Sequence, residues 1–228
     1  MLKNILVWTA RCLTIGLVCQ AVVIGMFRVV PPCITPLMVQ RILQFPFKGN
    51  SPQINHIWVS YDHVSPWIFR GVIAGEDGKF LTHHGIDWQA VEHAKKVNAS
   101  RIKRGQQPLG ASTISMQTAK NIFLLPIRSM IRKAAEVAYT YAIEAVWGKR
   151  RILEVYVNMI EWGDGIYGIE AASQKYFNKH AEDLTQDEAI RLVAVVPNPR
   201  KFSPLQPTGY VRHRIAFIQG RKEVAIPK

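Results

Sequence analysis

The chain has 228 residues, which suits one globular domain with a substantial core and a short appendage. Its formal net charge of +13 calls for an anionic partner: nucleic acid, an anionic membrane surface or a phosphorylated substrate. The three cysteines, Cys12, Cys19 and Cys33, exclude a disulfide framework but do not decide the compartment.

An uncharged run of sixteen residues occupies positions 12–27, with an arginine at each end. As a helix it spans roughly 24 Å, and flanking arginines can extend it by placing their charges at the interface. A cleavable signal peptide and a buried core helix are the alternatives. No A-x-A-like site follows the run, and Pro31-Pro32 separates it from the domain. We therefore predict a retained membrane anchor at residues 1–30, whose flanking charges leave the orientation undetermined.

The rest of the chain is predicted to be mostly α-helical. Residues 31–60 are predicted as a juxtamembrane connector with a short strand around residues 57–59, and residues 61–228 as the main domain. Apolar spacing, caps and helix breakers predict helices at residues 66–76, 88–97, 113–125, 131–147, 149–159, 168–177 and 185–196. Two stretches are predicted as loops, the basic residues 100–108 and the glycine-rich residues 161–168.

Charge is distributed unevenly along the predicted domain. No Asp or Glu occurs between His93 and Ala135, whereas nine Lys and Arg residues do. Glu76-Asp77 precedes this cationic stretch and Glu136 follows it. Such an arrangement suits acid–base chemistry beside a highly anionic group such as a pyrophosphate.

Glu76 is the first candidate for proton transfer. It follows an apolar helix at the negative end of the helix dipole, and both burial and the dipole raise the pKa of a carboxyl group there. A solvated surface residue is the alternative reading of a Glu near a helix end. His83 and His84 are candidate metal ligands, but no second His or Cys cluster at ligand spacing supports them. A structural or hydrogen-bonding role is the better interpretation of these histidines.

Four polar residues share one face of the helix predicted at 113–125, namely Thr113, Gln117, Lys120 and Asn121. A solvated amphipathic face would also explain them. The small residues 110–112 lead into the start of this helix, where an anion can approach closely.

Arg132 and Lys133 stand four and three residues before Glu136. Two intrahelical ion pairs are one explanation. A cation cluster that holds phosphates beside a second carboxylate is the other, and spacing alone does not separate them.

Several motifs, in the right order over about residues 70–204, resemble those of the peptidoglycan glycosyltransferases. EDGKFLTHHG is similar to the family's E-D-x-x-F-x-x-H-x-G, GASTISMQTAKN to G-x-S-T-x-x-Q-Q-x-x-K-N, and RKAAE to R-K-x-x-E. KRRILEVYVN, GIYGIEAASQKYFNK and VPNPRKFSP also match. Because the sequence stops at residue 228 without room for a transpeptidase domain, it resembles the monofunctional members rather than the bifunctional penicillin-binding proteins.

The resemblance implies a lysozyme-like, mostly α glycosyltransferase domain behind one N-terminal transmembrane helix. It implies an anchor in the bacterial cytoplasmic (inner) membrane and an active site on the outer, periplasmic side. Lipid II, the growing glycan chain and membrane lipids are the expected partners, together with other cell-wall synthesis or division proteins, and nucleic acid is not expected.

The resemblance also implies roles for single residues. Glu76 would take the proton from the acceptor sugar hydroxyl as it attacks the anomeric carbon of the donor, with inversion and release of polyprenyl pyrophosphate. Four cations would neutralise that leaving group: Lys120, Arg128, Arg132 and Lys133. Glu136 would orient them or ligate a divalent cation (Mg²⁺ or Mn²⁺), and no organic cofactor is expected.

The remaining motif residues are expected to hold sugar and phosphate oxygens or to shape the site. They are Asp77, Phe80, His83, Gly85, Ser112, Thr113, Gln117 and Asn121. Met116 stands where the family has the first Gln of its pair, a residue that could close a capping box with Thr113.

Two alternative functions stay open at this point. A lysozyme-like fold could cleave glycan instead, although a hydrolase has no need for an acid-free stretch of nine cations. A membrane-tethered nucleic-acid binder would also be basic. It would interleave aromatic residues with its cations, whereas residues 93–135 contain only Phe123.

Overall fold

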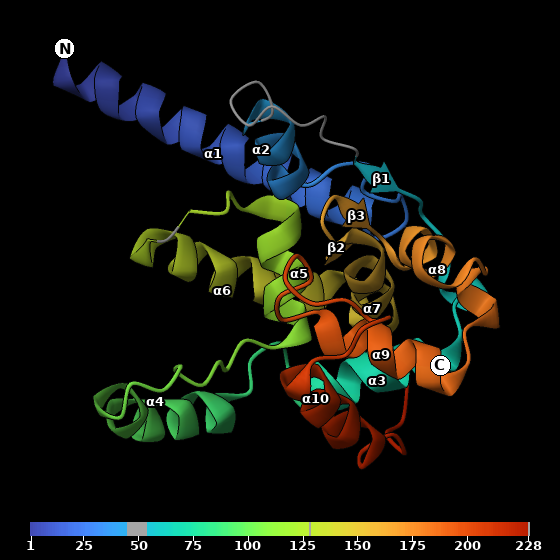
Figure 1. Cartoon of the computed structure of the whole chain (residues 1–228). Coiled ribbons are helices and arrows are strands. Elements are labelled where there is room, and N and C mark those ends of the chain that lie inside the picture. The colour runs from blue at the N-terminus through green and yellow to red at the C-terminus, as the bar shows by residue number, and fades with distance from the viewer. Residues whose placement is uncertain (45–53, 128, 228) are drawn as a thin grey trace.

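The computed structural model describes residues 1–44, 54–127 and 129–227, and it is mostly helical, as the sequence predicts (Figure 1). The first helix, α1 (Leu2–Phe27), carries the N-terminus away from the rest of the molecule (Figure 1). Its segment Val7–Phe27 is long and apolar enough to cross a membrane. The last turns of α1 return to the domain, where the Ile24 carbonyl accepts a hydrogen bond of 2.7 Å from Trp147 Nε1.

The connector contains a helix that the sequence analysis did not predict. Helix α2 (Pro36–Gln44) follows Thr35, whose hydroxyl oxygen accepts the backbone N–H of Met38. Met38 itself is 1% exposed and belongs to the core of the domain. Part of the core therefore lies before residue 61, in the segments predicted as anchor (Ile24) and connector (Met38).

Two groups of helices form the centre of the described domain. In one, α3 (Pro66–Glu76) packs on α9 (Gln186–Val195) and α10 (Gly209–Gln219). In the other, α5 (Ile114–Phe123) lies between α6 (Met130–Val146) and α7 (Gly148–Met159). The capping box predicted at Thr185 and Glu188 opens α9 and is confirmed.

Small residues let α10 approach α3 closely. A Cβ atom on Gly75 would lie 3.2 Å from Ile218 of α10 and 3.3 Å from Val193 of α9. Glycine at this position therefore fixes how near the C-terminal helix comes to the end of α3, where Glu76 lies.

A small sheet, one further helix and two 3₁₀ turns pack together at one side of the domain. Helix α8 (Ile169–Phe177) lies beside a three-stranded sheet in the order β1 (Asn55–His56), β3 (Ile166–Tyr167), β2 (Glu161–Gly163). Two 3₁₀ turns, η2 (Tyr61–His63) and η3 (Ala181–Asp183), contact each other beside it.

Three predictions of local structure are wrong. The short strand covers residues 55–56 rather than 57–59, because the Val59 N–H is bonded to the Asn158 side chain instead of a strand. The stretch 161–168 is not a loop, because β2 and β3 pair antiparallel within it. Helix α4 (Trp88–Lys103) runs through the start of the predicted basic loop and ends only before Gly105, whose φ is +65°. Arg101 and Lys103 in its last turn favour the negative end of the helix dipole, which explains the extra length.

Candidate active site

Glu76 is the last residue of α3, and its carboxylate is held by two side chains from distant parts of the chain. Arg214 Nη2 on α10 donates to Oε1 at 2.8 Å, and Gln117 Nε2 on α5 donates to Oε2 at 3.2 Å. The side chains of Glu76 and Arg214 are 13% and 17% exposed. Burial raises the pKa of Glu76, as the sequence predicted, and the Arg214 guanidinium and the Gln117 amide oppose that rise.

The side chain of Gln117 is itself held by a hydrogen bond from α7. Its Oε1 accepts a hydrogen bond of 3.4 Å from the Tyr156 hydroxyl on α7. Complete burial raises the pKa of Tyr156 well above its ordinary value of 10, so the phenol stays protonated and can donate. The hydrogen bond to Tyr156 therefore leaves the Gln117 amide nitrogen facing Glu76.

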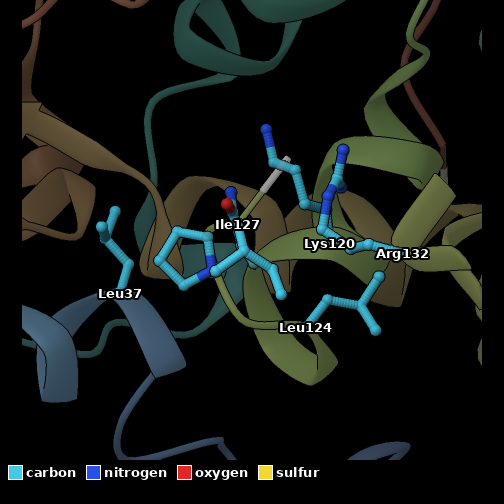
Figure 2. A pocket seen from close by; sticks show the side chains of 7 residues that line it. Leu37, Lys120, Leu124, Ile127 and Arg132 are labelled. Carbon is cyan, nitrogen blue, oxygen red and sulfur yellow. The ribbon is translucent and has the colours of Figure 1, made fainter. Parts of the chain in front are cut away.

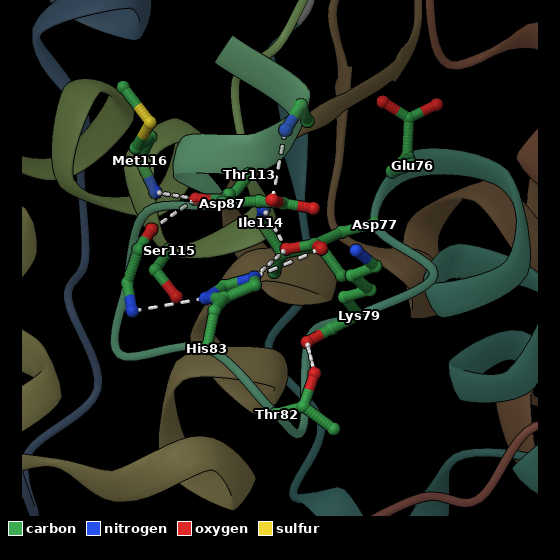
Figure 3. Close-up of polar contacts among 12 residues, drawn as sticks. Glu76, Asp77, Lys79, Thr82, His83, Asp87, Thr113, Ile114, Ser115 and Met116 are labelled. Carbon is green, nitrogen blue, oxygen red and sulfur yellow. Dashed lines mark hydrogen bonds and ion pairs between the residues drawn. The ribbon is translucent and has the colours of Figure 1, made fainter. Parts of the chain in front are cut away.

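The loop after α3 is closed by Asp77 and His83, whose side chains meet beneath Glu76, while the Glu76 carboxylate points away from this pair (Figure 3). The Gly85 N–H donates to His83 Nδ1 at 3.1 Å, so the other ring nitrogen, Nε2, carries a hydrogen and donates to Asp77 at 2.9 Å. Asp77 Oδ2 also accepts the Ile114 N–H at the start of α5. One buried carboxylate thus joins the ends of α3 and α5.

Thr113 caps α5 and holds the same loop. Its hydroxyl oxygen accepts the Met116 N–H at 3.1 Å, and the hydroxyl donates to the Gly85 carbonyl. The predicted cap is confirmed, and it forms with methionine at position 116. The Met116 side chain is buried in the domain.

Phe80 lies fully buried under the loop, with the ammonium group of Lys149 4.6 Å from its ring centroid. Lys149 Nζ also donates to the His83 carbonyl and to Glu144. Phe80, His83 and Gly85 therefore support the loop that follows Glu76. Their prediction as substrate-binding residues stays a prediction.

A pocket of about 170 Å³ opens above this loop and is called here the carboxylate pocket. It is lined by Glu76, Asp77, Gly78, Lys79, Asp87, Ala90, Gly110, Ala111, Ser112 and Thr113. Because several of these residues are small, the backbone before α5 leaves room for a bulky polar group next to Glu76.

A second pocket, of about 240 Å³, is called here the cation pocket. It is lined by Leu37, Lys120, Asn121, Leu124, Pro126, Ile127 and Arg132. Figure 2 shows Leu37 of α2 on the opposite side of this pocket from Lys120 and Arg132. The pocket therefore joins a cationic wall to an apolar one.

Glu136 balances the cations at the edge of this pocket. Arg132 Nη1 donates to Oε2 at 2.7 Å, Lys133 Nζ donates to Oε1 at 2.6 Å, and the Glu136 side chain is 3% exposed. The intrahelical ion pairs that spacing allowed are present, and Arg132 also lines the pocket, so the two explanations are compatible. Burial lowers the pKa of Lys120, while Glu136 opposes that effect.

Helix α5 joins the two pockets. Thr113 at its start lines the carboxylate pocket, Lys120 and Asn121 near its end line the cation pocket, and Gln117 lies between them beside Glu76. Arg128 lies outside the described residues. The sequence analysis did not identify Arg214 or Leu37. Thr35-Pro36, a cap followed by proline, was the one signal for α2.

The described residues do not form a resident metal site. Both oxygens of Glu136 face cations. Within residues 1–44, 54–127 and 129–227, no group of three or more His, Cys, Asp or Glu side chains is arranged to hold a metal ion.

Fold and site together define a mostly helical enzyme in which one helix, α5, both contacts a buried carboxylate and lines a pocket with a cation. A model of the transglycosylase family matches residues 45–222. The chain belongs to this family, and the prediction of a peptidoglycan glycosyltransferase is confirmed at the level of family and enzyme class.

Individual relatives agree with the family. A biosynthetic peptidoglycan transglycosylase of Rhodospirillum centenum is 50% identical over 198 residues, which cover 87% of this chain and 82% of that protein. Proteins of the same name from Shigella boydii and Escherichia coli are each 47% identical over 199 residues, 86% of this chain and 80% of theirs.

Proposed function

We propose that the chain polymerises Lipid II into linear β-1,4 glycan strands of peptidoglycan, with the growing glycan as donor and Lipid II as acceptor. The observation that carries the proposal is the buried Glu76 carboxylate, which contacts Gln117 on the same helix whose Lys120 lines the cation pocket. A glycosyl transfer from a diphosphate needs both parts, a base for the incoming hydroxyl and cations for the leaving group.

Glu76 is the base in this reaction. Its carboxylate accepts the proton of the acceptor hydroxyl while that oxygen bonds to the anomeric carbon of the donor. The bond from this carbon to the diphosphate oxygen breaks on the opposite face, so the configuration inverts. The raised pKa of Glu76 makes its carboxylate a stronger base than an exposed one.

The cation pocket receives the departing diphosphate. Lys120 and Arg132 line it, so their charges stabilise the negative charge that grows as the bond breaks. Glu136 holds Arg132 and Lys133 in place rather than leaving them to solvent. Leu37, Leu124 and Ile127 offer an apolar surface to the first units of the polyprenyl chain.

The polyprenyl substrate places the enzyme at a membrane. Helix α1 would anchor it in the bacterial cytoplasmic membrane as a single span, with the domain on the outer side. Several exposed apolar residues near the cation pocket suit a domain that touches the bilayer: Leu125, Ile127, Met130 and Ile131. The charge of +13 adds attraction to anionic lipid.

A divalent cation remains a separate proposal. Mg²⁺ or Mn²⁺ would enter bound to the diphosphate, because both carboxylate oxygens of Glu136 are already paired with Arg132 and Lys133. Titration of the protein alone with Mn²⁺, followed by electron paramagnetic resonance, should show weak binding that tightens when polyprenyl diphosphate is added.

The proposal is tested with Glu76→Gln, which keeps the size of the side chain and removes proton acceptance. Incubated with labelled Lipid II, the wild type should form lysozyme-sensitive polymer, and Glu76→Gln should polymerise about 10² times more slowly or worse. Lipid II binding should persist because the cations are untouched. Glu92→Gln, at an exposed position of α4, should match the wild type.

Two results would contradict the proposal. Near wild-type polymerisation by Glu76→Gln would show that Glu76 is not the base of the reaction. A wild type that shortens finished glycan and forms none from Lipid II would make the protein a hydrolase.

A further inference from the structure

Arg214 is the one cation that touches Glu76 within the part of the chain that the structure describes. Its Nη2 lies 2.8 Å from Glu76 Oε1 and 3.5 Å from the Gly75 carbonyl oxygen at the end of the same helix. Gln117 donates to the other carboxylate oxygen. Each oxygen of the carboxylate therefore accepts a hydrogen bond, and side chains of α5 and α10 fix the orientation of the group.

The position of Arg214 is built into the packing of α10. Val211 and Ile218 on this helix are fully buried, and Ile218 packs against Gly75 of α3. The chain after α10 is held as well, because the Tyr61 hydroxyl donates to the Pro227 carbonyl at 2.8 Å. The C-terminal helix therefore presents Arg214 to Glu76 through contacts that do not involve the cations of α5 and α6.

Other charged or titratable groups also face Glu76. Asp77 adjoins it in the chain, Lys120 lies on α5 and Tyr156 on α7, and each interacts electrostatically with it. Asp77 disfavours the Glu76 carboxylate, and the buried phenol of Tyr156 is neutral. The electrostatic interaction of Lys120 with Glu136 is stronger than its interaction with Glu76. Arg214 is consequently the main charge that offsets the burial of Glu76.

We propose that Arg214 is a positioning residue of the reaction, which keeps Glu76 ionised and aims its carboxylate at the acceptor hydroxyl. The inference rests on the proposed function of Glu76. It gives the C-terminal helix a role in proton transfer, since the base is competent only when α10 is docked on α3.

Loss of the charge has a defined consequence. An opposite charge within about 4–6 Å lowers the pKa of a carboxyl group by roughly 1–3 units. Removing Arg214 should therefore raise the pKa of Glu76 further, so that more of it is protonated and idle at neutral pH. A purely structural ion pair would instead lower the melting temperature and leave the pH dependence of the rate unchanged.

The experiment compares kcat/KM against pH for the wild type, Arg214→Gln and Arg214→Lys. In Arg214→Gln the acid limb should move up by about 1–3 pH units, so the rate on the acid side of the profile should fall by up to about 10-fold for each unit of that shift and recover in part at higher pH. Arg214→Lys keeps the charge, so its limb should stay near that of the wild type. Arg212→Ala, which removes an exposed charge from the same helix, should change neither.

A second measurement separates this inference from the proposed function. The ¹³C signal of the Glu76 carboxyl group, assigned by its absence in Glu76→Gln, can be titrated without substrate. Its midpoint should rise in Arg214→Gln. If the wild type polymerises Lipid II but the limb and the midpoint do not move, the role of Arg214 is overturned alone. If no polymer forms while the midpoint moves, the proposed function fails and the Arg214–Glu76 linkage stands.

Discussion

The imidazole of His83 donates to the carboxylate of Asp77 at 2.9 Å, and this buried pair closes the loop that follows α3. Asp77 also accepts the first N–H of α5, so the loop that carries Glu76 is tied to the helix that carries Gln117 and Lys120. The pair thus sets the distance between the base and the cations, although neither residue lines the cation pocket.

Asp77→Ala should destabilise the domain because it leaves His83 Nε2 and the Ile114 N–H without an acceptor. A buried donor without a partner costs about 1–3 kcal/mol, so the free energy of unfolding, measured in urea, should fall by at least that amount. The control is Asp62→Ala. The Asp62 side chain is 76% exposed and its ion pair with Arg150 lies at the surface, so its loss should cost no more than about 1 kcal/mol. Equal losses would mean that Asp77 is not a structural link.

The cation pocket can be tested by removing single charges. Lys120→Ala or Arg132→Ala should lower kcat about 10²-fold, because each removes a charge that stabilises the leaving diphosphate. Lys103→Ala and Arg104→Ala remove exposed charges at the end of α4 and should cost little. Similar losses at all four positions in a Lipid II polymerisation assay would indicate general attraction to anionic lipid instead of a defined pocket.

The pH dependence of kcat/KM should be bell-shaped and narrowed on both sides. Glu76 must be ionised to accept a proton, and burial raises its pKa. As the pH is lowered, the rate should therefore begin to fall at a higher pH than it would with an exposed carboxylate as the base. Lys120 must be protonated to attract phosphate, and burial lowers its pKa. As the pH is raised, the rate should therefore begin to fall at a lower pH than it would with an exposed lysine.

Lys120→Arg identifies the alkaline limb. A guanidinium stays charged throughout the range, so this variant should lose the alkaline fall even if its maximal rate is lower. Lys103→Arg should leave the profile unchanged. An alkaline limb that persists in Lys120→Arg would assign it to another group.

The sequence predicted the parts of the site that are local and missed those that depend on packing. Gln117, Lys120 and Asn121 follow from helical spacing, and Thr113 from capping chemistry, so α5 was predicted almost in full. Arg214 lies in a segment without a recognised motif, 138 residues from Glu76. Only the approach of α10 to Gly75 brings them together, and no local pattern encodes that contact.

The domain boundary shows the same limit. Proline and aromatic content predicted a connector at residues 31–60, but Met38 fills the core and Leu37 lines the cation pocket. Burial of a single side chain on a short helix leaves little periodicity to detect. The length of α4 was underestimated for a related reason, because its last turn is polar and is favoured by charge rather than by an apolar face.

The place of α2 leads to a prediction about the N-terminus. If α1 is the anchor, the full-length chain should resist extraction from membranes by salt. A chain beginning at Pro31 should be soluble and folded, but less stable than the full chain because it loses the Ile24 carbonyl that accepts Trp147 Nε1. A chain beginning at Gln40 lacks Leu37 and Met38 and should be less stable and less active.

In the chain from Pro31, Met38→Ala should cost about 2–5 kcal/mol, since Met38 is 1% exposed.

Thermal unfolding measures the effect. For a domain of this size, about 1 kcal/mol corresponds to roughly 2–4 °C, so Met38→Ala should lower the melting temperature by about 4–20 °C. Met130→Ala is the matched control, because Met130 is among the exposed apolar residues and its truncation should leave the melting temperature unchanged. Equal melting temperatures for the two variants would mean that α2 is a connector after all. Release of the full-length chain by salt alone would show that α1 does not anchor it.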